Sequence, residues 1–290
     1  MKAPTIVIIH IKNEEYMLKW WLQHHVNKFD GGVVIDYNST DGSLDLVKKL
    51  APNWTIVKSV NKDFSALNCD IEVFNIEKQI QQQYRGAYVI VLNVTEYLIG
   101  DTTKLAHVPF RVQKLVPCDI ICDMPNEMYK EPDENVSLIK QRFHGVQLPY
   151  DDKCRFDPYQ SYIDQEAYRR AFDDPSFHQK VHFCNRVMRS LHNFNLNYME
   201  TSMYGTGRHY WGTPCEDFRI LWYGFSPFTR KMLDRKIAIQ HEVPAEDKAK
   251  GIGPAHNIDD DKALARLNYH QEFAKPLDRL ISKYEPDMWR

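Results

Sequence analysis

The stretch TIVIIHIKNE, residues 5–14, decides the fold that this chain is expected to adopt. Its first seven residues are almost all apolar and rich in β-branched side chains, which is typical of a strand buried on both faces. The polar Lys12-Asn13-Glu14 ends this run, and apolar residues then recur at helical spacing between Met17 and His24. We therefore predict a buried strand, a polar loop and a helix at the start of the chain.

The same alternation continues to about residue 100. Further strands are predicted at residues 33–36, 54–57 and 88–92, with helices at 43–50 and 70–84. Strands that alternate with helices favour an α/β fold with a mostly parallel, doubly wound sheet. After residue 100 this alternation of strands and helices ends. Residues 125–180 are predicted to be rich in loops, and residues 260–281 are predicted to be helical. We expect one domain over residues 1–290, with a nucleotide-binding half (1–100) and an acceptor-side half (101–290).

Composition excludes several functional classes. The 290 residues carry a net charge of −2 with no basic stripe, which disfavours nucleic-acid binding. No apolar run approaches the roughly 20 residues of a transmembrane helix, and the first apolar run is too short for a secretory signal. Six cysteines without metal-ligand spacing indicate free thiols in a reducing compartment. The expected location is the cytoplasm, with attachment to a membrane surface left open.

Three polar segments follow predicted strands. They are Lys12-Asn13-Glu14 after the first strand, residues 36–41 after the second, and Asn93-Val94-Thr95-Glu96 after the fourth. In open α/β sheets ligands bind beyond the carboxyl ends of the strands, so these segments should converge on a site. The sequence has no Gly-x-Gly-x-x-Gly after the first strand and no Gly-Lys-Ser/Thr loop, which argues against dinucleotide-binding and P-loop folds.

Two of these segments carry a family resemblance. Residues 8–15 read IIHIKNEE, Trp21-Leu22-Gln23-His24-His25 follows, and residues 35–43 read IDYNSTDGS. Together they resemble the family 2-like GT-A glycosyltransferases, in the branch with a Lys-Asn-Glu first loop and an Asp-x-x-Ser-Thr-Asp second loop. The resemblance covers residues 5–100. It implies a GT-A-like fold that transfers a sugar, with inversion, from a nucleoside-diphosphate donor, expected to be UDP-linked, to a glycan or other hydroxyl acceptor.

The resemblance assigns the nucleotide to the first two loops. Asp36, which ends a buried strand, is expected to accept hydrogen bonds from the uracil or the ribose, with Ser39 and Asp41 nearby. Helix capping explains Thr40 and Asp41 equally well. Asn13 and Glu14 match the nucleotide-side loop of the family, while Glu14 also suits the first turn of a helix, where acids are favourable.

The fourth strand departs from the family pattern. Such enzymes carry Asp-x-Asp, often followed by Glu and an aromatic residue, and a carboxylate there holds a divalent metal on the diphosphate. Here Asn93 and Thr95 replace both aspartates, and only Glu96 keeps a charge. Hard cations prefer carboxylate oxygens, so a weak Mn²⁺ or Mg²⁺ site is expected. Three interpretations stay open: a metal held by Glu96 with His256, metal-independent transfer that uses Lys and Arg, or loss of catalysis.

The second half offers further candidates, each with a structural alternative. Lys180 and Lys250 are expected to face the diphosphate, although Lys250 also suits a solvated turn. Glu216 and Asp217 resemble the Glu-Asp pair that opens a helix beside the acceptor. Either carboxylate would take the proton of the attacking hydroxyl, which an inverting transfer requires. The alternative for this pair is an exposed first turn of a helix.

Two functional classes therefore compete. The first is a glycosyltransferase with Asn13, Glu14, Asp36, Ser39, Asp41, Asn93, Thr95, Lys180 and Lys250 on the donor, Glu96 and His256 on a metal, and Glu216 or Asp217 as base. The second is a non-catalytic nucleotide- or glycan-binding partner protein of the same fold. A sugar-phosphate nucleotidyltransferase is disfavoured because no glycine-rich basic loop follows the first strand.

Overall fold

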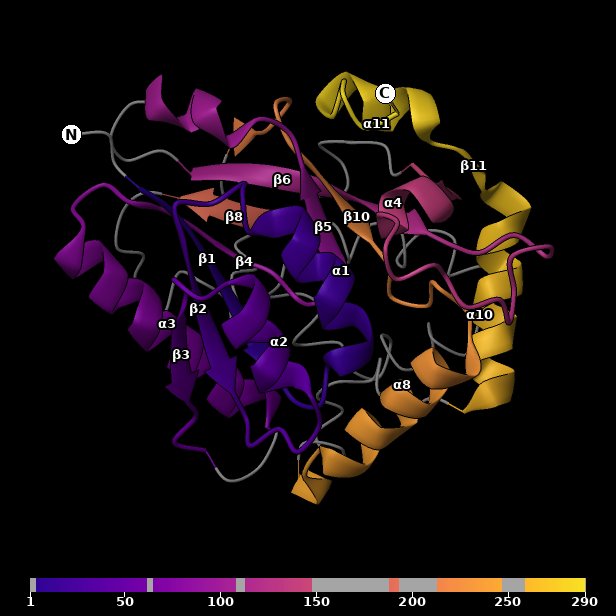
Figure 1. Ribbon diagram of the computed structural model, residues 1–290, viewed down its shortest axis with the longest axis horizontal. Helices are drawn as coiled ribbons and strands as arrows, with labels where there is room; N and C mark the ends of the chain where they lie inside the picture. Colours follow the sequence, from indigo (N-terminus) through magenta and orange to yellow (C-terminus); the bar gives the residue numbers. More distant parts are fainter. Residues whose placement is uncertain are drawn as a thin grey trace, which may run out of the picture.

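A computed structural model describes residues 4–61, 65–107, 113–147, 188–192, 213–246 and 259–289. A mixed sheet with the order β11-β7-β6-β8-β4-β1-β2-β3 runs through the molecule (Figure 1). Its strands are β1 (Thr5–Ile11), β2 (Gly31–Asp36), β3 (Thr55–Lys58), β4 (Tyr88–Val91), β5 (Glu96–Ile99), β6 (Gln113–Ile121), β7 (His144–Val146), β8 (Met188–His192), β9 (Thr213–Pro214), β10 (Arg219–Trp222) and β11 (Lys275–Pro276). Strands β4, β1, β2 and β3 pair in parallel, which confirms the predicted α/β class.

The helices flank this sheet. They are α1 (Glu15–His25), α2 (Ser43–Leu50), α3 (Ala66–Gln83), the 3-10 helix η1 (Thr102–His107), α4 (Leu138–Gln141), α8 (Arg230–Glu242), α10 (Asp260–Phe273) and α11 (Asp278–Tyr284). Among the described residues, none of these helices is long and apolar enough to cross a bilayer.

β1 is buried on both faces, as its composition predicts. Val7 and Ile9 pack with Trp21 of α1 in one core, whereas Ile6 and Ile8 pack with the apolar side of α3 in another. Because successive side chains of a strand point to opposite faces, helices must cover both sides of β1. Figure 1 shows α1 and α2 on one side of the parallel strands and α3 on the other.

Helices α1 and α2 begin side by side and cap each other. The Asp41 carboxylate accepts hydrogen bonds from the amides of Glu15 (3.0 Å) and Ser43 (3.0 Å). The Glu15 carboxylate accepts one from the amide of Gly42 (3.0 Å). The first amides of a helix lack partners within that helix, and these carboxylates supply them. The two polar loops that the sequence singles out are therefore joined at the helix starts.

Two predictions for the second half are wrong. The helix predicted over residues 260–281 is interrupted, because Lys275-Pro276 forms β11, which pairs with β7. Proline favours an extended residue before it and lacks an amide hydrogen, so it separates α10 from α11. Glu216 and Asp217 do not open a helix, since β10 begins two residues later. The chain that follows Asp217 instead forms β10, because its backbone pairs with β5 and β6.

Candidate functional site

The carboxyl ends of three neighbouring strands define the candidate site. β1 lies between β4 and β2, with Ile8 opposite Val91 and Ile11 opposite Asp36. Asn13 therefore follows β1, Asp36 ends β2 and Asn93 follows β4 at the same edge of the sheet. This is the edge at which parallel α/β sheets bind ligands.

The loops after β1 and β2 are joined directly. The amide of Asn13 donates to Ser39 Oγ (3.1 Å), and the amide of Thr40 donates to Asn13 Oδ1 (2.7 Å). Asn13 (φ 53°) and Asn38 (φ 57°) have left-handed backbones, which asparagine tolerates better than most residues. The predicted residues Asn13 and Ser39 thus lie together, although both also support the loops.

Asp36 has the environment expected of a ligand-binding carboxylate. Its side chain is buried, and its Oδ1 accepts a hydrogen bond from the amide of Ser39 (3.0 Å). Among the residues that the structure describes, no other hydrogen bond reaches this carboxylate. Oδ2 is therefore available to a donor group such as a ribose hydroxyl or a uracil N–H.

Glu14 and Asp41 have partners within the protein. Asp41 caps the two helices, as described above. Glu14 is buried and pairs with Arg235 of α8. Burial raises the pKa of the Glu14 carboxyl, while the neighbouring Arg235 guanidinium acts to lower it. Arg235 lies in no motif and is 221 residues away in the chain, so the sequence offers no signal for this contact.

The segment after β4 forms a tight turn closed by Glu96. The amide of Asn93 donates to Glu96 Oε2 (2.8 Å), and the amide of Glu96 donates to the Asn93 carbonyl (2.9 Å). Arg189 of β8 donates to the same carboxylate through Nε and Nη2, at 2.8 and 2.9 Å. Thr95 is buried, and its carbonyl accepts the amide of Tyr223 (2.7 Å). Asn93 and Thr95 thus lie at the edge of the sheet, with the Glu96 carboxylate held inside the protein.

Three predicted residues, Lys180, Lys250 and His256, lie outside the described residues. Within the described part of the chain, no three His, Cys, Asp or Glu side chains gather in a way that could hold a metal ion. The predicted metal ligand Glu96 and the predicted diphosphate ligands Lys180 and Lys250 therefore stay predictions.

Glu216 and Asp217 lie at the opposite end of the sheet from Asn13 and Asp36. A Cβ placed on Gly100 would lie 2.5 Å from the Asp217 carbonyl oxygen, so the two segments touch. Gly100 also accepts a hydrogen bond from Lys28, which follows the last turn of α1. The 11 residues of α1 lead away from the Asn13 loop for roughly 16 Å at 1.5 Å per residue. The structure therefore does not bring this exposed pair to the edge of the sheet that carries Asn13, Asp36 and Asn93.

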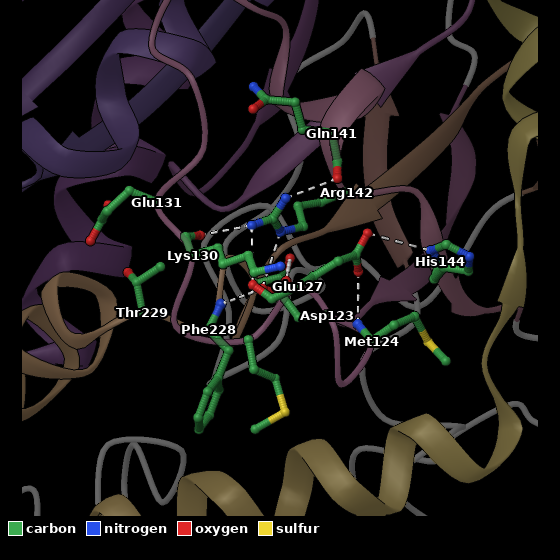
Figure 2. Close-up of polar contacts among 12 residues, drawn as sticks. Asp123, Met124, Glu127, Lys130, Glu131, Gln141, Arg142, His144, Phe228 and Thr229 are labelled. Atoms are coloured by element: carbon green, nitrogen blue, oxygen red, sulfur yellow. Dashed lines mark hydrogen bonds and ion pairs between the residues drawn. The ribbon is translucent and has the colours of Figure 1, made fainter.

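Asp123 organises a network of polar contacts beyond the carboxyl end of β6. Its buried carboxylate accepts hydrogen bonds from Arg142 Nε (3.1 Å), Ser226 Oγ (2.5 Å) and the amide of Phe228 (2.9 Å). Figure 2 shows Arg142 between Asp123 and the backbone carbonyls of Lys130 and Glu127. Asp123 thereby joins the end of β6 to the segment that leads into α8. An aspartate directly after an apolar run was the available sequence signal for this group.

Neither a family model nor a curated protein matches the sequence. The solved structures that the chain matches include a fragment of S. aureus TarS, with 14% identity over 94% of this chain and 72% of that chain and a TM-score of 0.34. A TarS fragment in complex with UDP has 21% identity over 48% of this chain and 42% of that chain, with a TM-score of 0.32. 4-diphosphocytidyl-2C-methyl-D-erythritol synthase has 13% identity over 47% of this chain and 70% of that chain, with a TM-score of 0.29. In its alignment with a longer TarS chain, the protein spans 26% of that chain.

Proposed function

We propose that this chain is a glycosyltransferase that binds a nucleoside-diphosphate sugar, with uridine as the base, at the carboxyl ends of β1, β2 and β4. The observation that carries the proposal is the convergence of Asn13, Asp36 and Asn93 at one edge of the parallel strands. Asp36 supplies a buried carboxylate with one oxygen available, which suits the hydroxyls and N–H of a nucleoside.

Transfer proceeds with inversion to a glycan or another hydroxyl acceptor in this proposal. The acceptor binds on the side formed by β6, β10 and the Asp123 group, because these elements extend past the end of β4. Asp123 itself is a structural residue there, since its carboxylate already accepts three hydrogen bonds. Preorganised donors that stabilise the leaving diphosphate supply the largest catalytic contribution.

The second candidate is a nucleotide- or glycan-binding protein without turnover. Two observations favour it: Asn93 and Thr95 replace the expected carboxylates, and Glu216 and Asp217 lie far from the donor edge. In its nucleotide-binding form, the second candidate shares the nucleotide site with the enzyme and differs from it only in chemistry.

A thermal-shift screen against uridine, cytidine, adenosine and guanosine diphosphates tests the shared site. UDP is expected to raise the melting temperature by mass action, and the other three to raise it less. A donor-hydrolysis assay with UDP-sugars then separates the candidates, because only the enzyme releases free sugar. No shift with any nucleotide would remove the enzyme and would leave the second candidate only as a glycan-binding protein.

A further inference from the structure

The carboxylate of Glu96 accepts hydrogen bonds from the Arg189 guanidinium, from the backbone amide of Asn93 and, at 3.5 Å, from the Asn93 side-chain amide. Arg189 Nε and Nη2 donate to Oε2 and Oε1, and the amide of Asn93 donates to Oε2. Arg189 is 2% exposed and Glu96 6% exposed, so water does not screen this pair. Two parallel N–H···O bonds of this kind are the strongest arrangement that arginine and a carboxylate form.

This ion pair lies in the segment after β4, where the family resemblance predicts a metal site. β8 runs antiparallel to β4, with Leu191 opposite Ile90. Arg189, two residues earlier in β8, is therefore level with the residues that follow β4. A buried guanidinium with one positive charge thus stands beside the Asn93–Glu96 turn.

These residues do not fit a divalent cation. Mn²⁺ and Mg²⁺ need charged oxygens, and Asn93 and Thr95 offer neutral ones. For Glu96 to bind a cation, it would have to give up both hydrogen bonds from Arg189. That change would break a buried, bidentate ion pair, which is strongly unfavourable.

We propose that this chain binds the donor diphosphate without a divalent metal, and that Glu96 is a positioning residue held by Arg189. The inference rests on the proposed function and defines how the same site works. By accepting the amide of Asn93, Glu96 holds the turn that presents Asn93 at the donor edge. The ion pair between Glu96 and Arg189 thus supports the metal-independent interpretation of the segment after the fourth strand.

Lys12 is the cation that this arrangement provides for the diphosphate. It directly follows β1, its side chain is 16% exposed, and its Nζ lies 3.5 Å from the Asn38 carbonyl and 3.7 Å from Glu242. The ammonium therefore stands between the loops that follow β1 and β2, with weak partners that a phosphate can replace.

Calorimetric titration of UDP in the presence of EDTA and in the presence of excess MnCl₂ tests the proposal. The two dissociation constants are expected to agree within about threefold. Glu96→Gln is expected to weaken UDP binding equally in both conditions, because it loosens the turn without removing a metal ligand. Tighter binding with manganese by more than about tenfold would overturn the inference. Absence of UDP binding in both conditions would instead remove the proposed function, and this inference with it.

A pair of lysine variants tests the source of the positive charge. Lys12→Met is expected to weaken UDP binding about tenfold while the affinity for uridine stays the same, because only UDP carries the diphosphate. Lys48→Met is the matched control, since Lys48 is exposed on the neighbouring α2 and pairs only with Asp45 among the described residues. Equal UDP affinity in the Lys12→Met and Lys48→Met variants would contradict the assignment of Lys12.

A double variant, Glu96→Gln with Arg189→Met, removes both charges of the buried ion pair together. It is expected to fold and to bind UDP with the same affinity in EDTA and in excess MnCl₂; binding that is more than about tenfold tighter with manganese would overturn the inference.

Discussion

Arg235 of α8 pairs with Glu14 in the loop after β1, and both side chains are 9% exposed. The pair fixes α8 against the loop that carries Asn13. Removing one partner of a buried ion pair leaves the other charge without compensation.

Arg235→Gln is therefore expected to lower the free energy of unfolding by about 3 kcal/mol. The double variant with Glu14→Gln should recover much of this loss, because no charge is then left buried. Urea unfolding of the four members of the cycle measures the coupling. Arg230→Gln on the same helix is the control, since Arg230 is 57% exposed and its ion pairs are screened by water, so its loss should cost much less. An equal cost for both arginines would contradict a special role for Arg235.

Asp36→Ala is expected to weaken UDP binding at least about tenfold, which is roughly 1.4 kcal/mol. The reason is the loss of a buried carboxylate that keeps one oxygen available at the carboxyl end of β2. Calorimetry measures the affinity, and thermal unfolding verifies the fold of the variant. Asp45→Ala serves as control, because Asp45 is 87% exposed on α2. Unchanged affinity in folded Asp36→Ala would end the assignment.

Asp123→Asn is expected to destabilise the protein by about 3 kcal/mol or more. An asparagine side chain has one oxygen, whereas Asp123 accepts hydrogen bonds from Arg142, Ser226 and Phe228 with two. Chemical denaturation measures the loss, with Asp45→Asn for comparison. Because the network links β6 to the segment before α8, a variant as stable as the wild type would show that these contacts are dispensable.

Stability should fall as pH decreases below 6.5. The imidazole of His25 donates from Nδ1 to the Trp21 carbonyl and accepts at Nε2 from the Leu98 amide, which requires the neutral ring. Burial lowers its pKa well below 6.5, and burial also lowers the pKa of His24 to about 3. Below pH 6.5 these two imidazoles therefore bind protons in the unfolded chain but stay neutral in the folded protein, so protonation favours unfolding. Each histidine contributes a loss of about 1.4 kcal/mol per pH unit.

The slope of stability against pH isolates the contribution of His25. His25→Gln removes one titrating ring, so the slope between pH 6 and pH 4.5 should decrease by about 1.4 kcal/mol per unit. His241→Gln is the control, because His241 is exposed at the end of α8. If both variants kept the wild-type slope, another group would be responsible for the acid sensitivity.

Asp217→Asn and Glu216→Gln are expected to leave kcat within about threefold of the wild type. A catalytic base would instead cost roughly 10²–10⁴-fold on amide substitution. The expectation follows from the contact of this segment with Gly100, at the far end of β5 from the donor edge. Steady-state kinetics with a UDP-sugar measures it once an acceptor is known. A loss of a hundredfold or more would restore the pair as base and require a different arrangement of this segment.

The first half of the fold could be predicted because its signals are local. The β-branched run of β1, the helical spacing in α1 and the capping residues around Asp41 each act within a few residues. Parallel strands then force their carboxyl ends to one edge, so Asn13, Asp36 and Asn93 could be grouped from the chain order alone. The predictions for the second half were weaker because pairing between distant strands, as in β10 and β11, prevails over local preference.

The partners of the buried charges were decided by the tertiary structure. Glu96 meets Arg189 across 93 residues, and Asp123 meets Arg142 and Ser226 from separate segments. A buried carboxylate needs a compensating cation or several hydrogen bonds, but the sequence does not say which residue provides them. The sequence by itself therefore determined which polar segments lie together at one edge of the sheet, whereas only the packing of β8 against β4 decided that Glu96 faces a guanidinium.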